Sequence, residues 1–139
     1  MDKLSTSDKI YVSKSVIPGA GRGVFAKGNI KLGELIERCP VIEIPEGDSS
    51  LLTETILVTY FYFLGKKKER VTLTLGFGSI YNHSYTPNAI YKDKHRQRAI
   101  DFVAIKPIKK GEEITVSYNP GKKNKNPLWF YPSSRCDNH

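Results

Sequence analysis

Short stretches of alternating or continuous apolar residues run along most of this chain, with turn residues every few positions. Such stretches predict strands. They cover residues 10–16, 23–27, 35–44, 71–75, 90–91, 99–104 and 113–116. Pro40 interrupts the stretch 35–44, so we expect a pair of strands broken at that residue. Many short strands around one core predict a mainly β single domain.

One segment has the spacing of a helix instead. Between Asp48 and Leu64, the apolar residues Leu52, Ile56, Tyr60 and Phe63 fall three or four positions apart. This spacing predicts one helix, with Ser49 or Ser50 placed to cap its start and Gly65 to end it.

Charge adds a feature that the apolar pattern does not contain. The chain has 139 residues and a formal net charge of +8, concentrated in three basic clusters at 66–68, 92–98 and 122–125. Such runs are usually solvated loops, and the functional alternative is a surface that approaches a polyanion such as nucleosomal DNA. No aromatic–basic stacking pattern or known DNA-reading motif accompanies the clusters, so charge alone does not indicate nucleic-acid recognition.

Segments that would anchor or export the chain are not apparent. No apolar run approaches the roughly 20 residues that span a bilayer, and the N-terminus lacks an apolar signal core. We therefore expect a soluble intracellular protein that is not secreted, in the cytoplasm or the nucleus. The two cysteines, Cys39 and Cys136, are too few for a disulfide framework or a multi-cysteine zinc site, so we expect free thiols and no metal.

The segment from Leu75 to Asn88 contains the most informative chemistry. Asn82-His83-Ser84 followed by Pro87-Asn88 is a poor strand and an improbable helix. Its structural interpretation is an Asx turn followed by a Pro-Asn turn. Its functional interpretation is a ligand site, because an Asn side chain and backbone groups freed from a ladder can both donate and accept hydrogen bonds. Such groups suit the edge of an adenine.

Three motifs in this order resemble the SET-domain protein-lysine methyltransferases. They are Gly-Arg-Gly-Val-Phe-Ala at 21–26, Leu-Gly-Phe-Gly-Ser-Ile-Tyr-Asn-His-Ser at 75–84 with Pro87-Asn88, and Gly-Glu-Glu-Ile-Thr-Val-Ser-Tyr at 111–118. The likeness extends from about Ile10 to Tyr118 and is strongest to the compact viral and bacterial members. It implies a mainly β SET fold (β-clip), with strands in small sheets, a knot-like C-terminal threading and one short helix. Residues 1–118 would form the SET domain, and 119–139 a tail.

The resemblance also implies a reaction and a cofactor. The chain would transfer a methyl group from S-adenosyl-L-methionine to the ε-amine of a protein lysine, leaving S-adenosyl-L-homocysteine, without a metal. Tyr118 would lie beside the transferring methyl group. Asn82 would bind the cofactor's amino-acid end through its side chain, and His83 would bind the adenine through its backbone. The other residues implied to contact the cofactor are Ala20, Gly21, Arg22, Gly23 and Tyr60.

Several aromatic residues are candidates for the walls of a lysine channel. Tyr60 is the preferred active-site tyrosine of the segment 60–64, Tyr62 is the alternative register, and both could instead be core. Tyr91 would line the channel and restrain how many methyl groups are added. The segment after Tyr118 lacks the cysteine-rich zinc segment of larger relatives, and Trp129 and Phe130 would form an aromatic lid there or simply anchor the tail.

The partner implied by the family is a protein with an exposed lysine, with a histone tail as one option. A basic domain repels a basic tail unless carboxylates line the groove, so a non-histone substrate stays open. Candidates for such a lining are Glu43, Glu46, Asp48, Glu54 and Asp101. The alternative function is a SET-fold module without catalysis that associates with chromatin or another acidic partner through its basic surface. Direct nucleic-acid binding and a homodimer also stay open, whereas no membrane partner is expected.

Overall fold

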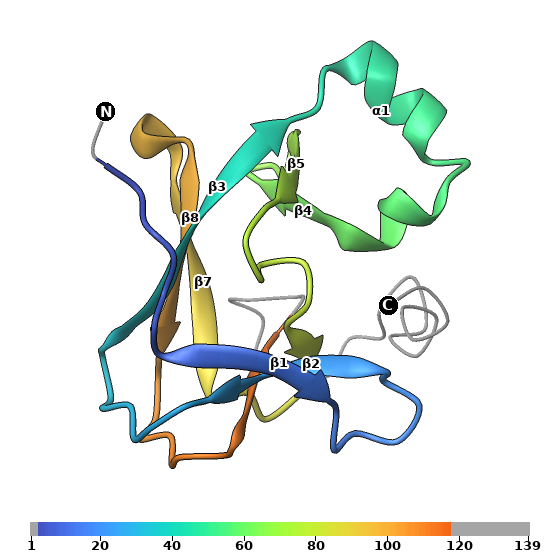
Figure 1. Ribbon diagram of the computed structural model, residues 1–139. Helices are drawn as coiled ribbons and strands as arrows, with labels where there is room; N and C mark the ends of the chain where they lie inside the picture. The colour runs from blue at the N-terminus through green and yellow to red at the C-terminus, as the bar shows by residue number, and fades with distance from the viewer. Residues whose placement is uncertain (1–2, 118–139) are drawn as a thin grey trace.

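The computed structural model describes residues 3–117 and places nine strands there in two small sheets (Figure 1). The first sheet has the order β1-β2-β9-β6 and the second the order β4-β5-β3-β8-β7. This arrangement confirms the predicted mainly β fold with one α-helix. The strands are β1 (Ile10–Lys14), β2 (Arg22–Ala26), β3 (Leu35–Glu43), β4 (Phe61–Leu64), β5 (Arg70–Thr74), β6 (Asn82–His83), β7 (Ala89–Lys94), β8 (Ala99–Ala104) and β9 (Glu113–Val116).

The first sheet joins segments that are far apart in the sequence. Strand β9 lies between β2 and β6, so the C-terminal part of the described chain is inserted beside its beginning. Strand β6 pairs with β9 in parallel, with Asn82 opposite Thr115 and His83 opposite Val116. The segment that looked too rich in turn residues for a strand is therefore a strand of two residues, which ends where Ser84 N–H donates to the Val116 carbonyl at 3.0 Å.

The second sheet corrects the expected break at Pro40. Strand β3 continues through this residue for nine residues, pairing with β8 along most of its length and with β5 through Val41, Ile42 and Glu43. The Val41 N–H donates toward β8, to the Arg98 carbonyl at 3.0 Å. Because backbone groups alternate in direction along a strand, the missing N–H of Pro40 falls on the β5 side, where the Pro40 carbonyl accepts the Leu75 N–H at 2.9 Å. The Leu75 carbonyl opposite Pro40 accepts the Gly78 N–H at 3.1 Å instead, so the proline leaves no acceptor unpaired there and the strand does not break.

The predicted helix over 48–64 was wrong in its extent. An α-helix, α1, covers only Glu46–Leu52, a 3₁₀ helix, η1, covers Ile56–Tyr60, and the aromatic residues that follow form β4. Pro45, and neither serine, occupies the N-cap, while the Ser49 and Ser50 hydroxyls donate to carbonyls inside the helix. The segment Phe61–Leu64 pairs with β5 instead, as aromatic residues favour on a half-buried sheet.

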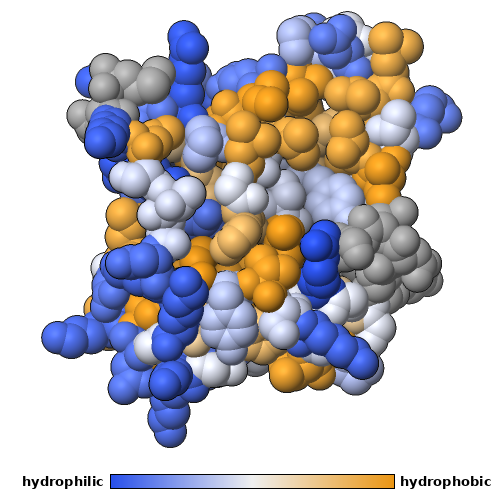
Figure 2. Space-filling model, viewed as in Figure 1, coloured by the Kyte–Doolittle hydropathy of each residue, from blue (hydrophilic) through white to orange (hydrophobic). Residues whose placement is uncertain are grey.

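Residues of both sheets form the core, and the helix α1 contributes none. No residue of α1 is buried, and Leu51 and Ile56 are exposed. Figure 2 shows hydrophobic residues at the surface on the upper right, where Figure 1 places α1 and η1. The core cluster draws on both sheets and includes Ile10, Val24, Ile36, Cys39, Tyr62, Tyr81, Ile100, Phe102, Ile108, Ile114 and Val116. None of the described helices is long and apolar enough to cross a membrane.

Candidate active site

A buried carboxylate, Glu113, lies at the centre of the segments that the motifs singled out. Its side chain accepts hydrogen bonds from the Ser15 hydroxyl at 2.9 and 3.0 Å, from the Val16 N–H at 3.0 Å and from the Asn82 amide at 2.9 Å. Only 7% of the residue is exposed. A buried carboxylate costs free energy unless donors surround it, and here two segments, the loop after β1 and strand β6, supply those donors. Glu113 therefore fixes the loop after β1 and strand β6 relative to β9.

Hydrogen bonds from a single atom, Nδ2, hold the Asn82 side chain in place. Its Nδ2 donates to the Arg22 carbonyl at 2.8 Å as well as to Glu113, and the residue is 4% exposed. Both donor hydrogens of the amide are thereby used. Within residues 3–117, no hydrogen bond to Asn82 Oδ1 is formed, so this acceptor keeps its capacity for a ligand in a fixed orientation.

The backbone of His83 has a direction that follows from the sheet. Because Ser84 N–H donates to the Val116 carbonyl and His83 is opposite Val116, the N–H and C=O of His83 point away from β9. Strand β6 is the edge of its sheet, so these two groups face outward from it. The imidazole packs edge-on against Tyr85, with ring centroids 4.5 Å apart. One main-chain donor and one main-chain acceptor are thus presented side by side next to the Asn82 amide.

Asn88, to which the sequence assigned a turn and a place in the second motif but no contact, locks the end of that motif. Its amide donates to the Glu113 carbonyl at 2.9 Å and its Oδ1 accepts the Thr115 N–H at 2.9 Å. The side chain thus imitates a strand neighbour along β9. It connects the start of β7, and so the second sheet, to the same strand that carries Glu113.

The glycine loop approaches this centre closely. Gly21 has a φ of +68°, which favours glycine, and its carbonyl accepts the Ser15 N–H at 2.8 Å. At Gly23, a Cβ atom would lie 2.3 Å from Glu113 Oε2 and 3.1 Å from Asn82 Nδ2. Glycine at position 23 is therefore required by the packing of the carboxylate and the amide. Of the predicted loop residues 20–23, the structure brings Arg22 and Gly23 next to Asn82.

Two of the predicted active-site tyrosines, Tyr62 and Tyr91, lie in the second sheet. Tyr62 is in β4, 4% exposed, and its hydroxyl donates to the Gly78 carbonyl at 2.9 Å. Its ring packs edge-on against Tyr91, with centroids 4.8 Å apart, and against Phe102 at 6.1 Å. Burial raises the pKa of Tyr91 well above the usual value of a tyrosine. Tyr60 is buried at the end of η1. The structure brings Tyr62 and Tyr91 together and gives Tyr62 the contacts of a core residue.

A second buried carboxylate supports the approach to β6 and was also missed from the sequence. Glu37, 7% exposed, accepts the Tyr81 hydroxyl at 2.8 Å and the Phe77 N–H at 3.0 Å. Tyr81 directly precedes Asn82 and stacks on Phe102 at 4.3 Å. Burial and the Glu37 charge raise the pKa of the Tyr81 hydroxyl. The sequence contained one signal for the role of Glu37, a glutamate within an otherwise apolar strand. It contained no signal for the role of Ser15 as a donor to Glu113.

Three predicted site residues lie outside the described part of the chain. They are Tyr118 at the end of the third motif, and Trp129 and Phe130 of the expected lid. Strand β9 ends at Val116, two residues before Tyr118, and it pairs with both β2 and β6.

Comparisons with known proteins point in one direction. The SET domain family matches residues 21–119. The histone-lysine N-methyltransferase of Schizosaccharomyces pombe that is specific for H3 lysine-37 is 33% identical over 111 residues, covering 79% of this chain and 70% of the relative. The histone-lysine N-methyltransferase SETD7 of Halocynthia roretzi is 27% identical over 143 aligned positions, covering 89% of this chain but only 37% of the relative.

Solved structures agree with the sequence comparisons. The crystal structure of a Plasmodium falciparum protein assigned as a histone methyltransferase has a TM-score of 0.64 and 34% identity, covering 85% of this chain and 97% of that one. A chain of an active polycomb repressive complex 2 in its basal state has a TM-score of 0.66 and 26% identity, covering 81% of this chain and 15% of that one. With the match over residues 21–119, this chain belongs to the SET-domain family.

Proposed function

We propose that this chain transfers a methyl group from S-adenosyl-L-methionine to the ε-amine of a protein lysine, with Tyr118 as the principal active-site residue. The SET-domain relatives support a lysine methyltransferase function. The observation that carries the proposal is the fixed orientation of Asn82, whose amide is held by Glu113 and the Arg22 carbonyl where β2, β6 and β9 meet.

The arrangement around Asn82 fits the proposed cofactor. The Asn82 Oδ1 acceptor would bind the ammonium of the amino-acid part, and the outward N–H and C=O of His83 would pair with the adenine edge. The backbone of the loop 20–23 would approach the methionine end, because Gly21 has no side chain to intervene, while Gly23 leaves room for the Glu113 carboxylate behind it. The residues that would hold the cofactor thus come from the loop before β2 and from β6, with Glu113 beneath both.

The cofactor would supply the methyl group as a sulfonium, and the chain's own residues would align and neutralise the lysine. A free lysine has a pKa of about 10.4 and is protonated at neutral pH. An apolar, aromatic channel disfavours the ammonium, so the amine can be neutral when it enters. Tyr91 would contribute one wall of that channel, and its raised pKa keeps the hydroxyl protonated as a hydrogen-bond donor. Holding the two reacting groups in line would supply much of the rate.

We propose a histone lysine as the substrate, because the S. pombe and H. roretzi relatives are histone-lysine methyltransferases by name. Of the five carboxylates expected to line a groove for a basic tail, two are engaged in ion pairs, Glu43 with Arg70 and Asp101 with Arg38. The other three are exposed on or just after α1, namely Glu46, Asp48 and Glu54. These three are the candidates to attract a basic tail.

The decisive experiment is methyl transfer by the purified chain. Radiolabelled S-adenosyl-L-methionine is supplied at saturation with core histones or with a whole-cell lysate, using the wild type and Tyr118→Phe. We expect labelled protein with the wild type and a loss of about 10²-fold or more with the variant, because a hydroxyl beside the reacting atoms is removed. A catalytically inactive binding module predicts no labelled protein from either, and that result would overturn the proposal.

The domain boundaries belong to the same proposal. We propose residues 1–118 as the SET domain and 119–139 as a tail whose Trp129 and Phe130 close the lysine channel. Truncation before Asn126 separates a lid from an anchor. A lid predicts lost turnover with an unchanged thermal midpoint, whereas an anchor predicts a lower midpoint.

A further inference from the structure

Two of the three basic clusters in the sequence lie side by side in the structure. One is the turn between β4 and β5, residues 65–70, and the other is the end of β7 with the turn into β8, residues 92–98. Together these thirteen residues hold eight of the 22 lysines and arginines of the chain and only two carboxylates. We refer to the two segments as the basic turn pair.

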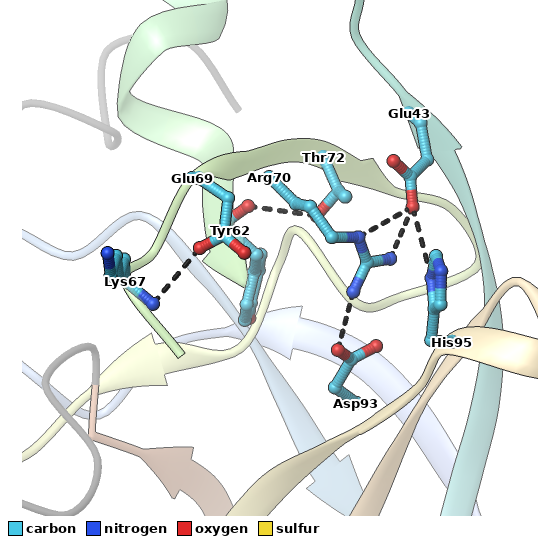
Figure 3. Close-up of polar contacts among 8 residues, drawn as sticks. All are labelled: Glu43, Tyr62, Lys67, Glu69, Arg70, Thr72, Asp93 and His95. Carbon is cyan, nitrogen blue, oxygen red and sulfur yellow. Dashed lines mark hydrogen bonds and ion pairs between the residues drawn. The ribbon is translucent and has the colours of Figure 1, made fainter. Parts of the chain in front are cut away.

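Arg70 joins the two segments. Its Nη1 binds Asp93 Oδ2 at 2.6 Å, and its Nε donates to Glu43 Oε1 at 3.0 Å. The same Glu43 oxygen lies 3.6 Å from His95 Nδ1. Figure 3 shows Arg70 between these partners, with Lys67 and Glu69 on one side and His95 on the other. The ion pairs hold the two turns together and use up Glu43 and Asp93, which would otherwise offset the positive charge.

The remaining cations of the basic turn pair point to a binding role. These cations are Lys66, Lys67, Lys68, Lys92, Lys94, Arg96 and Arg98. Within the described residues 3–117, none of them forms an ion pair. Six are exposed and Lys94 is partly buried. Like charges crowded in this way repel one another, which favours an external polyanion.

The backbone provides an independent observation. Lys68 and Arg98 have φ values of +56° and +50°, and they are the only described residues other than glycine with positive φ. Glycine or asparagine would adopt this conformation at lower cost. One such residue lies in each turn. At both positions the residue has a long cationic side chain, although the backbone conformation favours a small residue. Backbone strain retained in both turns favours a functional reason for these two side chains.

We propose that the basic turn pair binds the phosphate backbone of a nucleic-acid duplex without reading its sequence. The two segments contain no aliphatic side chain and no Phe, Tyr or Trp, and their one ring is that of His95, 3.6 Å from Glu43. A protein interface usually has an apolar or aromatic centre, and a single strand is usually bound by base stacking on aromatic rings. A duplex backbone requires neither, because cations alone supply the affinity.

The test compares two double variants that remove equal charge. Lys68→Asn with Arg98→Asn removes one cation from each turn while suiting the positive φ, and leaves intact the backbone bonds from Lys68 N–H to the Gly65 carbonyl and from Arg98 N–H to the His95 carbonyl. Lys106→Gln with Lys109→Gln is the control. These two exposed lysines follow Ala104, which pairs with Ala89 at the opposite end of β7 and β8 from the turn.

Binding is measured by fluorescence anisotropy with a duplex DNA of about 20 base pairs and arbitrary sequence, at several salt concentrations. We expect the turn variant to bind at least fivefold more weakly than the wild type at low salt. The slope of log affinity against log salt should fall by about 1.8, for two phosphate contacts. Its thermal midpoint should equal or exceed that of the wild type, and the control variant should lose less than twofold.

Three results would overturn the proposal. The wild type fails to bind the duplex at low salt, or both variants weaken binding equally, which indicates net charge alone. In the third, single-stranded DNA or oligoglutamate binds as tightly as the duplex and is lost in the same variant, which identifies a different partner.

Discussion

At the scale of single residues, two buried carboxylates organise the site although neither would contact the substrate. Glu113 collects donors from the loop after β1 and from β6, and Glu37 collects them from Tyr81 and the turn before it. Each carboxylate faces donors that would be costly to bury alone. Two carboxylates therefore fix the position of Asn82: Glu113 through the Asn82 amide, and Glu37 through the preceding residue, Tyr81.

Glu113→Gln tests this arrangement directly. A glutamine keeps one acceptor oxygen and turns its NH₂ toward at least one of three donors, leaving a buried donor unsatisfied at a cost of about 1–3 kcal/mol. We expect a lower thermal midpoint and an affinity for S-adenosyl-L-homocysteine reduced by about tenfold or more, measured by calorimetry.

Glu112→Gln is the matched control. The neighbouring Glu112 is exposed and uses Oε1 to accept the Lys109 N–H at 3.1 Å, which a glutamine can also do, while its Oε2 has only a long contact of 3.5 Å with the Asn88 amide. Wild-type affinity in Glu113→Gln would show that Asn82 does not depend on the carboxylate.

Tyr91 gives a second prediction at this scale. If its hydroxyl restrains the lysine amine, Tyr91→Phe should raise the methylation state of the product, because the amine gains room and loses a hydrogen-bond partner. Mass spectrometry of a methylated peptide measures the mono-, di- and trimethyl fractions. An unchanged distribution would refute the role, and Tyr85→Phe, at an exposed residue, is the control.

At the scale of elements, the site depends on the close approach of β2 to β9. Strand β2 pairs with β9 through Val24 opposite Ile114 and Phe25 opposite Glu113. Gly23 precedes this pairing and leaves the space that the Glu113 carboxylate fills. A strand with a side chain at position 23 could not keep both the pairing and the carboxylate in place.

Gly23→Ala should therefore impair the site more than the fold. The added methyl group would displace Glu113 Oε2 and press on Asn82 Nδ2, so we expect cofactor affinity to fall at least tenfold by calorimetry, with a smaller change in thermal midpoint. Gly28→Ala is the matched control, since a Cβ there meets no atom within 4 Å. Equal behaviour of the two variants would contradict the close-packing argument.

At the scale of the whole molecule, the two sheets enclose tyrosines whose ionisation opposes folding. Burial raises the pKa of Tyr81 and Tyr91 in the folded state. An unfolded tyrosine has a pKa of about 10. Above that pH the unfolded chain releases protons that the folded chain retains, so the free energy of unfolding falls as pH rises. The stability that these buried, protonated hydroxyls allow is fully present below pH 10 and is lost as the pH rises above it.

We therefore expect the thermal midpoint to fall between about pH 10 and 11 more steeply in the wild type than in Tyr91→Phe. Tyr11→Phe is the control, because Tyr11 is exposed and its ring stacking on Phe25 does not need the hydroxyl. The measurement is the midpoint by circular dichroism across this pH range. Parallel curves for all three proteins would contradict the assignment.

How far the sequence predicts the fold depends on whether the relevant interactions are local. Strands β2, β5, β8 and β9 follow from apolar patterns within the strand, and their predicted positions agree with the structure. The segment 61–64 was wrongly taken as helix because its spacing fits either structure, and pairing with the distant β5 decided between them. Strand β6 is held by β9, more than thirty residues later, and not by any propensity of Asn-His.

The same division holds for the site. The sequence by itself determined the family motifs, the glycine positions and the candidates Asn82 and His83, because these depend on residue type and order. Only the tertiary structure decided that Glu113, Glu37, Asn88 and Ser15 support them, and that two basic clusters meet at Arg70. The physical reason is that hydrogen bonds to a buried carboxylate join segments up to 98 residues apart, and no local pattern records which distant donor will satisfy it.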